Sequence, residues 1–241
     1  MSDFAEFRAR GRAALLAGRA THDVPFVDGG TRWGTTAAFR PQDEIADRMA
    51  ELSATAGATG HWVHGARALH VTLRTLERYR THIPQDDPLR RAYGSALAEA
   101  VAGLPPARVR LAGVHPHPGG VVVGAHPEDD TLDTIRKRFA HVLESRGIRD
   151  VERGRVRDRW YVSLVHFAAP LTNAGELVAW CDAHADADFG TAELRTAEIV
   201  QYVHTGGGIR VNSLERAVLD GGGGLQPSSS AVTNCSRCQA T

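Results

Sequence analysis

Two short apolar segments of this chain each carry a large polar side chain followed two positions later by a small hydroxyl. The first contains His70 and Thr72, and the second, further along the chain, contains Tyr161 and Ser163. Side chains alternate between the faces of a β-strand, so the two polar residues of each segment share one face and the apolar residues take the other. If the two strands lie side by side, four polar groups converge above an apolar sheet. Such an arrangement suits the binding of a phosphate.

Three polar residues near these segments are further candidates. Arg74 shares the parity of His70 and either binds a phosphate as a charged fork or is solvated at the end of its strand. His166 follows Tyr161 at an odd spacing, which places it on the opposite face unless a β-bulge re-aims it. His64 has the same parity as His70, and we expect it to pack at the entry to the first strand.

A loop histidine and two tryptophans have both functional and structural interpretations. His117 lies in a stretch of His, Pro and Gly, residues 115–119, between two expected strands. Loops often carry functional residues, so His117 is a candidate contributor to a cleft, and the alternative is a surface turn. Trp160 and Trp62 offer rings on which a nucleobase could stack, although a tryptophan in such a strand more often belongs to the core.

Strands and helices alternate along the chain to position these residues. Apolar residues at helical spacing predict helices over residues 1–20, 43–56, 87–103, 130–147 and 175–185. Apolar runs bounded by turn residues predict strands over 31–39, within 62–76, and over 109–114, 120–125, 159–167, 194–204 and 208–218. The elements fall into two similar halves, approximately 31–110 and 111–219. This pattern predicts an α+β or α/β architecture with a central cleft.

The chain divides into three parts by composition. We expect an N-terminal helical extension over residues 1–30, a single domain of two lobes over 31–220, and a flexible Gly- and Ser-rich tail over 221–241. The tail has almost no apolar surface to offset the entropy of ordering. Its Cys235 and Cys238 have the spacing of half a zinc site, but the sequence has no second pair, so we expect no metal site.

The overall charge is balanced, with 28 Lys and Arg residues against 28 Asp and Glu residues. This balance gives no global attraction to nucleic acid or to a membrane surface, and it favours a small ligand over a long nucleic acid. No run approaches the roughly 20 apolar residues that a membrane-spanning helix requires. The N-terminus lacks the apolar core of a signal peptide, so we expect a cytoplasmic protein.

At the two motif segments the chain resembles the two-histidine phosphoesterase superfamily, which includes bacterial 2′-5′ RNA ligase-like proteins and cyclic nucleotide phosphodiesterases. The family is marked by a pair of His-x-Thr/Ser motifs, one on each of two pseudo-symmetric lobes. Here His70 and Thr72 match the first motif, whereas Tyr161 stands where the second motif has histidine, and Ser163 is kept. The resemblance covers approximately residues 33–219. It implies an α+β fold in which two pseudo-symmetric α/β lobes with antiparallel sheets form a central cleft.

The resemblance also implies a substrate and roles for the site residues. The substrate would be a nucleotide or an RNA end with a phosphodiester or 2′,3′-cyclic phosphate, bound by a monomer without metal or cofactor. His70 would act as general base or acid, because the pKa of histidine lies near neutrality. Thr72 and Ser163, the hydroxyls of the two motifs, would hold phosphate oxygens, and Arg74 is the candidate named above that would join them. Tyr161, whose phenol has an ordinary pKa of about 10, would donate a proton or a hydrogen bond.

Three functions remain open at this point. The first is a phosphoesterase that turns over a cyclic nucleotide by acid–base chemistry with His70. The second is a catalytically degenerate protein that binds a phosphate or a nucleotide, in which Tyr161→His would create activity where none existed. The third is a repurposed enzyme of specialised metabolism that acts on a phosphorylated or nucleoside-like small molecule.

Overall fold

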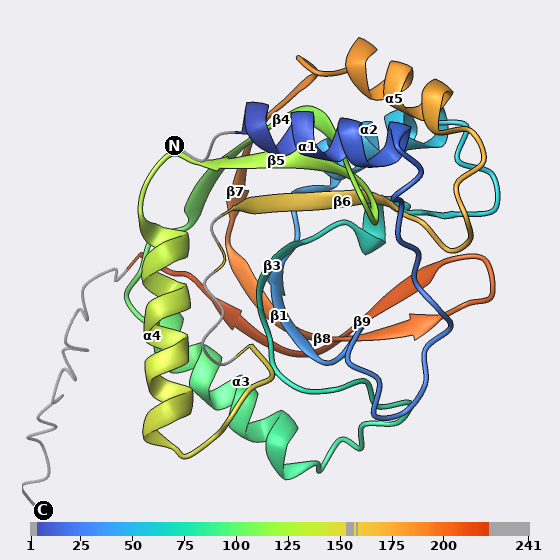
Figure 1. Ribbon diagram of the computed structural model, residues 1–241. Coiled ribbons are helices and arrows are strands. Elements are labelled where there is room, and N and C mark those ends of the chain that lie inside the picture. The colour runs from blue at the N-terminus through green and yellow to red at the C-terminus, as the bar shows by residue number, and fades with distance from the viewer. Residues whose placement is uncertain (1–3, 153–156, 158, 222–241) are drawn as a thin grey trace, which may run out of the picture.

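The strands of this protein form one curled sheet in which every pairing is antiparallel (Figure 1). The computed structural model describes residues 4–152, 157 and 159–221. The helices are α1 (Phe4–Leu16), α2 (Asp43–Ala54), the short η1 (Ala66–Ala68), α3 (Pro88–Val101), α4 (Thr131–Ser145) and α5 (Ala174–Ala183). The strands are β1 (Thr36–Phe39), β2 (Trp62–Val63), β3 (Val71–Thr75), β4 (Ala107–His117), β5 (Gly120–Pro127), β6 (Trp160–His166), β7 (Asp188–Leu194), β8 (Thr196–His204) and β9 (Ile209–Val218).

The order of the strands divides the sheet into two lobes. The sequence of neighbours is β7-β4-β5-β6-β3-β1-β8-β9, and β2 adds to β6 outside this path. One lobe therefore contains β4 to β7, and the other contains β1, β3, β8 and β9. The expected α+β class with two antiparallel lobes is confirmed. The expected division into residues 31–110 and 111–219 is wrong, because β8 returns to pair with β1 and places β8 and β9 in the first lobe.

The two lobes meet where β3 pairs with β6. The shared pair is Val71 with Val162, and both side chains are fully buried. Because cross-strand partners lie on the same face, the residues flanking this pair all lie on the other face of the sheet. The central pairing therefore brings the two motif segments together.

Both motif strands contain a β-bulge immediately after the motif hydroxyl. In β3, Thr72 pairs with Ala38 and Arg74 pairs with Ala37, so Leu73 has no partner on β1. The extra residue reverses the alternation of faces beyond it. Thr75 thus shares the face of Thr72, and Arg74 lies on the opposite face.

The bulge in β6 has the same position and the same effect. Ser163 pairs with Val122 and Val165 pairs with Val121, so Leu164 has no partner on β5. His166 therefore lies on the face of Ser163, whereas the spacing alone placed it on the opposite face. The placements expected for Arg74 and His166 are both wrong for this one reason.

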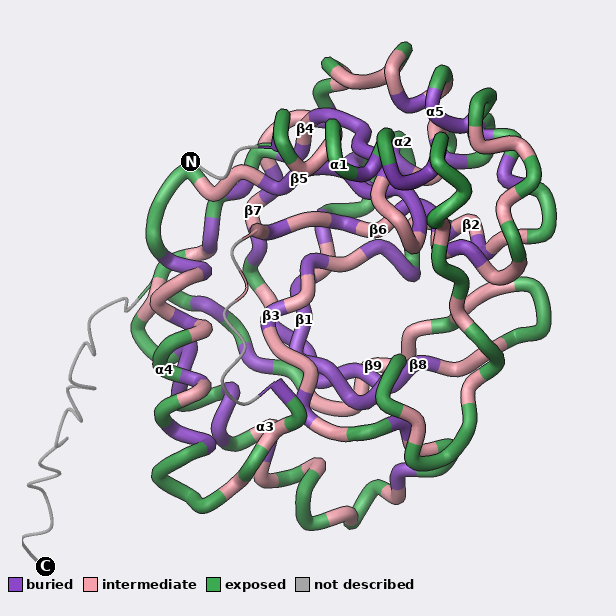
Figure 2. The backbone as a smooth tube through the Cα atoms, in the orientation of Figure 1, coloured by how far each residue is buried: buried purple, intermediate pink, exposed green. Residues whose placement is uncertain are grey.

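The helices cover the sheet and complete the core. α3 and α4 pack against each other, α3 covers β8 and β9, and α1 lies on β4 and α5 (Figure 1). In Figure 2 the buried stretches follow the strands, while the helices carry exposed outer faces. α4 buries Leu132, Ile135 and Phe139 at helical spacing, as the sequence predicted. Asp87 begins α3 by accepting a hydrogen bond from the backbone N–H of Arg90, at 2.9 Å.

Residues 17–35, which we call the strap, connect α1 to β1 and join the lobes (Figure 1). The backbone N–H of Asp23 donates to the carbonyl of Phe167 beside β6, at 2.7 Å. Further along, the N–H of Gly29 donates to the carbonyl of Tyr79 in the other lobe, at 2.9 Å. At the end of α1, Leu15 is buried in the main core, so the expected N-terminal extension shares the core of the lobes.

The remaining elements follow the sequence expectations with four differences. The strand expected over residues 31–39 begins only at Thr36, because residues 31–35 belong to the strap. β4 continues to His117, so the expected loop over residues 115–119 is reduced to a turn between β4 and β5. β2 and β7 were not expected, because neither segment has a distinct apolar run.

Cys235, Cys238 and the rest of residues 222–241 lie outside the described residues. Within the described part of the chain, no helix has both the length and the apolar character needed to cross a bilayer.

Candidate active site

A cavity of about 200 Å³ lies on the face of the sheet where the two lobes meet. His70 and Thr72 line it from the segment of β3, and Tyr161 and Ser163 line it from β6. The antiparallel register places His70 opposite Ser163 and Thr72 opposite Tyr161. The structure therefore brings together the four side chains of the two motif segments.

The imidazole of His70 is fixed at both nitrogens. Its Nδ1 lies 2.8 Å from the carbonyl oxygen of Ala68, and its Nε2 lies 2.8 Å from the hydroxyl of Tyr202. A carbonyl only accepts, so Nδ1 carries the proton and Nε2 accepts from Tyr202. Burial lowers the pKa of His70 more than the bond to Ala68 raises it, and the charges of Arg40 and Arg157 lower it further. His70 is therefore neutral at pH 7, with its basic nitrogen at the cavity.

Several hydroxyls surround this imidazole. Besides Thr72 and Ser163, the cavity is lined by Thr36 of β1, Thr75 of β3 and Tyr202 of β8. Sequence reasoning missed the last three. Thr75 reaches the cavity only because of the β3 bulge, and Thr36 and Tyr202 reach it through strand pairings that leave no local signal.

A positive charge lies beside these hydroxyls. The Nε of Arg157 donates to the carboxylate of Glu152 at 3.0 and 3.1 Å, and its Nη2 lies 3.5 Å from the hydroxyl of Thr75. Burial alone lowers the pKa of Arg157, but the hydrogen bond and charge of Glu152 and the interaction with Tyr161 raise it overall. Arg157 therefore stays charged next to Tyr161, and both line the cavity.

A second imidazole, that of His166, also lines the cavity. Its Nδ1 lies 2.6 Å from the Nε2 of His64, and its ring meets the ring of Trp33 edge-on, with centroids 4.6 Å apart. Burial lowers the pKa of His64 to about 3. Burial also lowers the pKa of His166 well below its ordinary value. Both rings are therefore neutral at pH 7.

Comparisons with known proteins give a match at the level of structure. No family model and no curated protein matches the sequence. TT0787 of Thermus thermophilus superposes with a TM-score of 0.57 at 17% identity. E. coli LigT in complex with 3′-AMP superposes with a TM-score of 0.54 at 14% identity, and a further phosphoesterase does so with 0.52 at 15%. Each alignment covers 78% of this chain and 98% of the other.

The chain has the LigT-like two-histidine phosphoesterase fold. The resemblance inferred from the two motif segments is thus confirmed for the fold. The alignments span nearly the whole length of each neighbour. Identities of this size extend to the fold alone, and the roles of the site residues stay predictions.

The LigT-like fold does not bring Arg74 into the cavity. The β3 bulge directs Arg74 to the opposite side, where its Nε and Nη2 bind the carboxylate of Asp150 at 2.6 and 3.0 Å. Both side chains are largely buried, with exposed fractions of 13% and 6%. The expected contact of Arg74 with phosphate is therefore wrong, and Arg157 provides the charge at the cavity instead.

Trp160 and Trp62 also lie outside the cavity. Trp160 alternates with Tyr161 along β6, is 6% exposed, and packs under the guanidinium of Arg136 at 4.6 Å. Trp62 is 4% exposed and packs edge-on against Trp33, with centroids 5.8 Å apart. The core interpretation holds for both tryptophans, so neither offers a free face for a nucleobase.

His117 is on the inner face of the sheet but is covered by α1. Its Nδ1 accepts a hydrogen bond from the N–H of Gly119 at 3.1 Å, and its ring packs against Phe7 of α1, with centroids 6.1 Å apart. Burial lowers the pKa of His117 to about 4. It does not line the cavity, contrary to the expected role as a cleft contributor.

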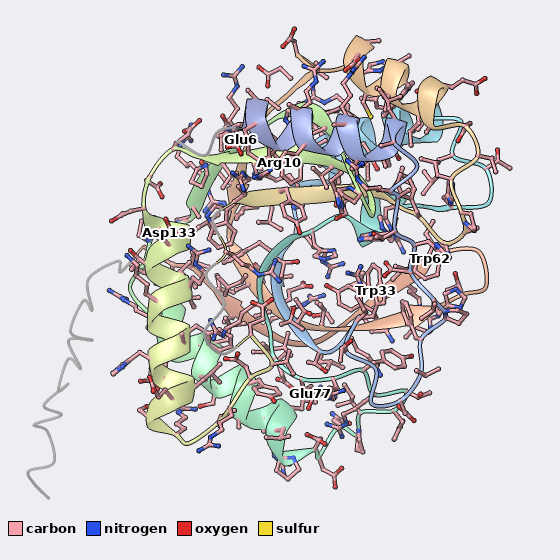
Figure 3. All side chains as sticks on the ribbon, in the orientation of Figure 1. Glu6, Arg10, Trp33, Trp62, Glu77 and Asp133 are labelled. Carbon is pink, nitrogen blue, oxygen red and sulfur yellow. The ribbon has the colours of Figure 1, made fainter. Side chains whose placement is uncertain are left out.

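The strap supplies one wall that sequence reasoning did not find. Thr31, Arg32 and Trp33 line the cavity, and Trp33 lies inside the ring of strands in Figure 3. Trp33 has a φ of 63°, a left-handed conformation that is strained for a tryptophan. Its ring is held by Phe26, Trp62 and His166. Nothing in the local sequence marks this conformation, since aromatic packing across the lobes imposes it.

Proposed function

We propose that this protein is a phosphoesterase that acts on a nucleotide or an RNA end carrying a phosphodiester or a 2′,3′-cyclic phosphate. The direct pairing of β3 with β6, which gathers His70, Thr72, Tyr161 and Ser163 around one cavity, carries this proposal. The neighbours of the same fold include LigT bound to 3′-AMP and LigT bound to phosphate, which supports a phosphorylated ligand here.

In this proposal the proton transfers are carried by two side chains. When the bound ligand displaces the hydroxyl of Tyr202 from the Nε2 of His70, this neutral nitrogen takes a proton from water as the water oxygen bonds to phosphorus. The bond from phosphorus to the ribose oxygen breaks, and that oxygen takes the phenolic proton of Tyr161. Arg157 stabilises the phenolate until it regains a proton from solvent, and His70 releases its proton to solvent. Thr72 and Ser163 bind the phosphoryl oxygens.

The size of the cavity restricts the part of the ligand that enters. Pockets for drug-sized ligands measure about 300–1,000 Å³, and this cavity measures about 200 Å³. It therefore suits the phosphoryl group with part of a ribose, while the base lies outside. The burial of Trp62 and Trp160 agrees with a base that makes few contacts with the sheet.

The test measures turnover of 2′,3′-cyclic AMP and of a 2′,5′-linked dinucleotide by the purified protein. We expect turnover that His70→Ala reduces by about 10²–10⁴-fold, the usual contribution of a general acid or base. The matched control is His141→Ala, because His141 is exposed on α4 and should leave turnover unchanged. Absence of turnover with every cyclic and 2′,5′-linked nucleotide would refute the hydrolase.

A second candidate is a phosphate- or nucleotide-binding protein without turnover. It is favoured by the hydroxyl of Tyr202, which occupies the basic nitrogen of His70, and by the phenol of Tyr161 in place of an imidazole. The variant Tyr161→His separates the two candidates. If it creates turnover in a protein that otherwise only binds phosphate, the natural protein is a binder.

A further inference from the structure

The bulge in β6 delivers a histidine that the motif pattern does not contain. Leu164 is the bulged residue, and its carbonyl accepts a hydrogen bond from the backbone N–H of His64 at 2.9 Å. This bond fixes the segment of His64 next to the bulge, and the same bulge turns His166 into the cavity. The cavity thus has one imidazole from each motif strand, His70 beside β3 and His166 in β6.

The contact between His64 and His166 selects a tautomer. The rings meet through the Nε2 of His64 and the Nδ1 of His166, at 2.6 Å. The other nitrogen of His64, Nδ1, is buried and has no hydrogen-bond partner among the described residues. A buried N–H without a partner is rarer than a buried acceptor without one. The proton of His64 therefore sits on Nε2 and is donated to the Nδ1 of His166.

This assignment leaves His166 with a donor for a ligand. A neutral imidazole has one N–H and one acceptor nitrogen. Because the Nδ1 of His166 accepts from His64, its own proton is on Nε2, the nitrogen left for the cavity. The burial of the two rings keeps both neutral at pH 7, as this arrangement requires.

The surroundings of His166 favour an anion. The titratable and charged groups that act on it from the strap, the sheet and the segment before β3 are Arg32, His64, His70 and His117. Three of them are imidazoles that are neutral at pH 7, and the fourth, Arg32, is charged and paired with Asp23 at 2.7 Å. An anion bound in the cavity would meet the guanidinium groups of Arg32 and Arg157, which both line it.

We propose that His166 is the second imidazole of this site and donates an Nε2–H hydrogen bond to the bound phosphoryl group, while His64 acts as a positioning residue that fixes its tautomer. The identity of the anion as a phosphoryl group rests on the proposed function. Proton transfer remains with His70 and Tyr161, and His166 supplies a neutral donor to an oxygen on which charge develops.

The first test is nitrogen NMR of histidine-labelled natural protein at pH 7, with the His166 signals assigned from a His166→Asn variant. We expect a protonated Nε2 and an unprotonated Nδ1 for His166, and a change in its Nε2 signal when inorganic phosphate is added. A proton on Nδ1 overturns the proposal. A phosphate-dependent change that is confined to His70, or no change at any histidine, also overturns it.

The second test measures the affinity for inorganic phosphate in two variants. His166→Val removes the donor, and we expect binding about tenfold weaker or more, as for the loss of a hydrogen bond to a charged group. His166→Asn keeps an N–H donor, and we expect affinity within about threefold of the natural protein. Equal losses in both variants overturn the proposal. His141→Ala is the exposed control.

The outcomes separate this inference from the proposed function. Turnover of a cyclic nucleotide without any response of His166 to phosphate refutes the inference and leaves the phosphoesterase standing. A response of His166 to phosphate without turnover supports the inference and refutes the hydrolase.

Discussion

β3 and β6 lie side by side at the centre of the sheet, and each has a bulge at the leucine after its motif hydroxyl. Beyond the bulge, β3 presents Thr75 to the cavity and β6 presents His166. The titratable ring comes before the hydroxyl in the first segment, as His70, and both before and after it in the second, as Tyr161 and His166. Both motif strands therefore have a bulge at the same position, but the side chains that follow the bulges and line the cavity differ in chemistry. Equivalent positions can carry different groups while the cavity keeps two imidazoles.

The two imidazoles also have different partners. The Nε2 of His70 accepts a hydrogen bond from Tyr202, and the Nδ1 of His166 bonds to His64. In His70 the basic nitrogen faces the cavity, while in His166 we infer that the N–H does. This difference makes His70 suited to accept a proton and His166 suited to donate a hydrogen bond.

The largest expected effect tests the different placement of two arginines, Arg74 outside the cavity and Arg157 in its lining. Arg74→Gln leaves the buried carboxylate of Asp150 without its charge partner, so we expect about 3–5 kcal/mol less unfolding free energy. The affinity for inorganic phosphate should change less than about twofold, because Arg74 lies outside the cavity. Arg157→Gln should weaken phosphate binding about tenfold or more. Denaturant unfolding and calorimetry measure both quantities. A tenfold loss of affinity in Arg74→Gln would contradict the placement.

The next effect tests whether the two bulges are equally important. Leu73 and Leu164 are both 0% exposed, so Leu73→Ala and Leu164→Ala should each cost about 2–5 kcal/mol of unfolding free energy. The control is Leu16→Ala at the end of α1, where the side chain is 50% exposed. A cost below about 1 kcal/mol for only one of the pair would show that the bulges are not equivalent.

The third effect concerns the dependence of stability on pH. Burial lowers the pKa of His117 to about 4, from an ordinary value of 6.5. Between pH 6.5 and pH 4 the unfolded chain binds a proton that the folded chain does not. The contribution of the neutral His117 to the free energy of unfolding is therefore fully present above pH 6.5 and is lost as the pH falls toward 4. For His117 this loss is on the order of 3 kcal/mol. His117→Asn should reduce the slope of unfolding free energy against pH by close to one proton. An unchanged slope would contradict the shift.

The smallest expected effect concerns the phenol in the second segment. Tyr161→Phe removes the proposed proton donor and keeps the ring, and we expect kcat for a cyclic nucleotide to fall about tenfold, less than the usual 10²–10⁴-fold because a phenol is a weaker acid than an imidazolium. The affinity for inorganic phosphate should stay within about threefold, since the other donors remain. An unchanged kcat would exclude Tyr161 as the acid and sharpen the role of His166.

The sequence predicted the parts of the molecule that local patterns encode. The helical spacing of Leu132, Ile135 and Phe139 predicted α4, and the alternation around His70 and around Ser163 predicted two strands with one polar face each. The errors at Arg74 and His166 have a single origin, because parity is read from spacing and a bulge changes parity without a clear local signal.

By itself the sequence determined that two apolar strands would each offer a polar pair on one face, because side-chain alternation is a property of the backbone. Only the tertiary structure decided what surrounds these pairs. Tyr202 arrives because β8 pairs with β1, Trp33 because the strap crosses between the lobes, and His166 because Leu164 has no partner on β5. These placements depend on contacts between residues far apart in the chain, and no local pattern encodes them.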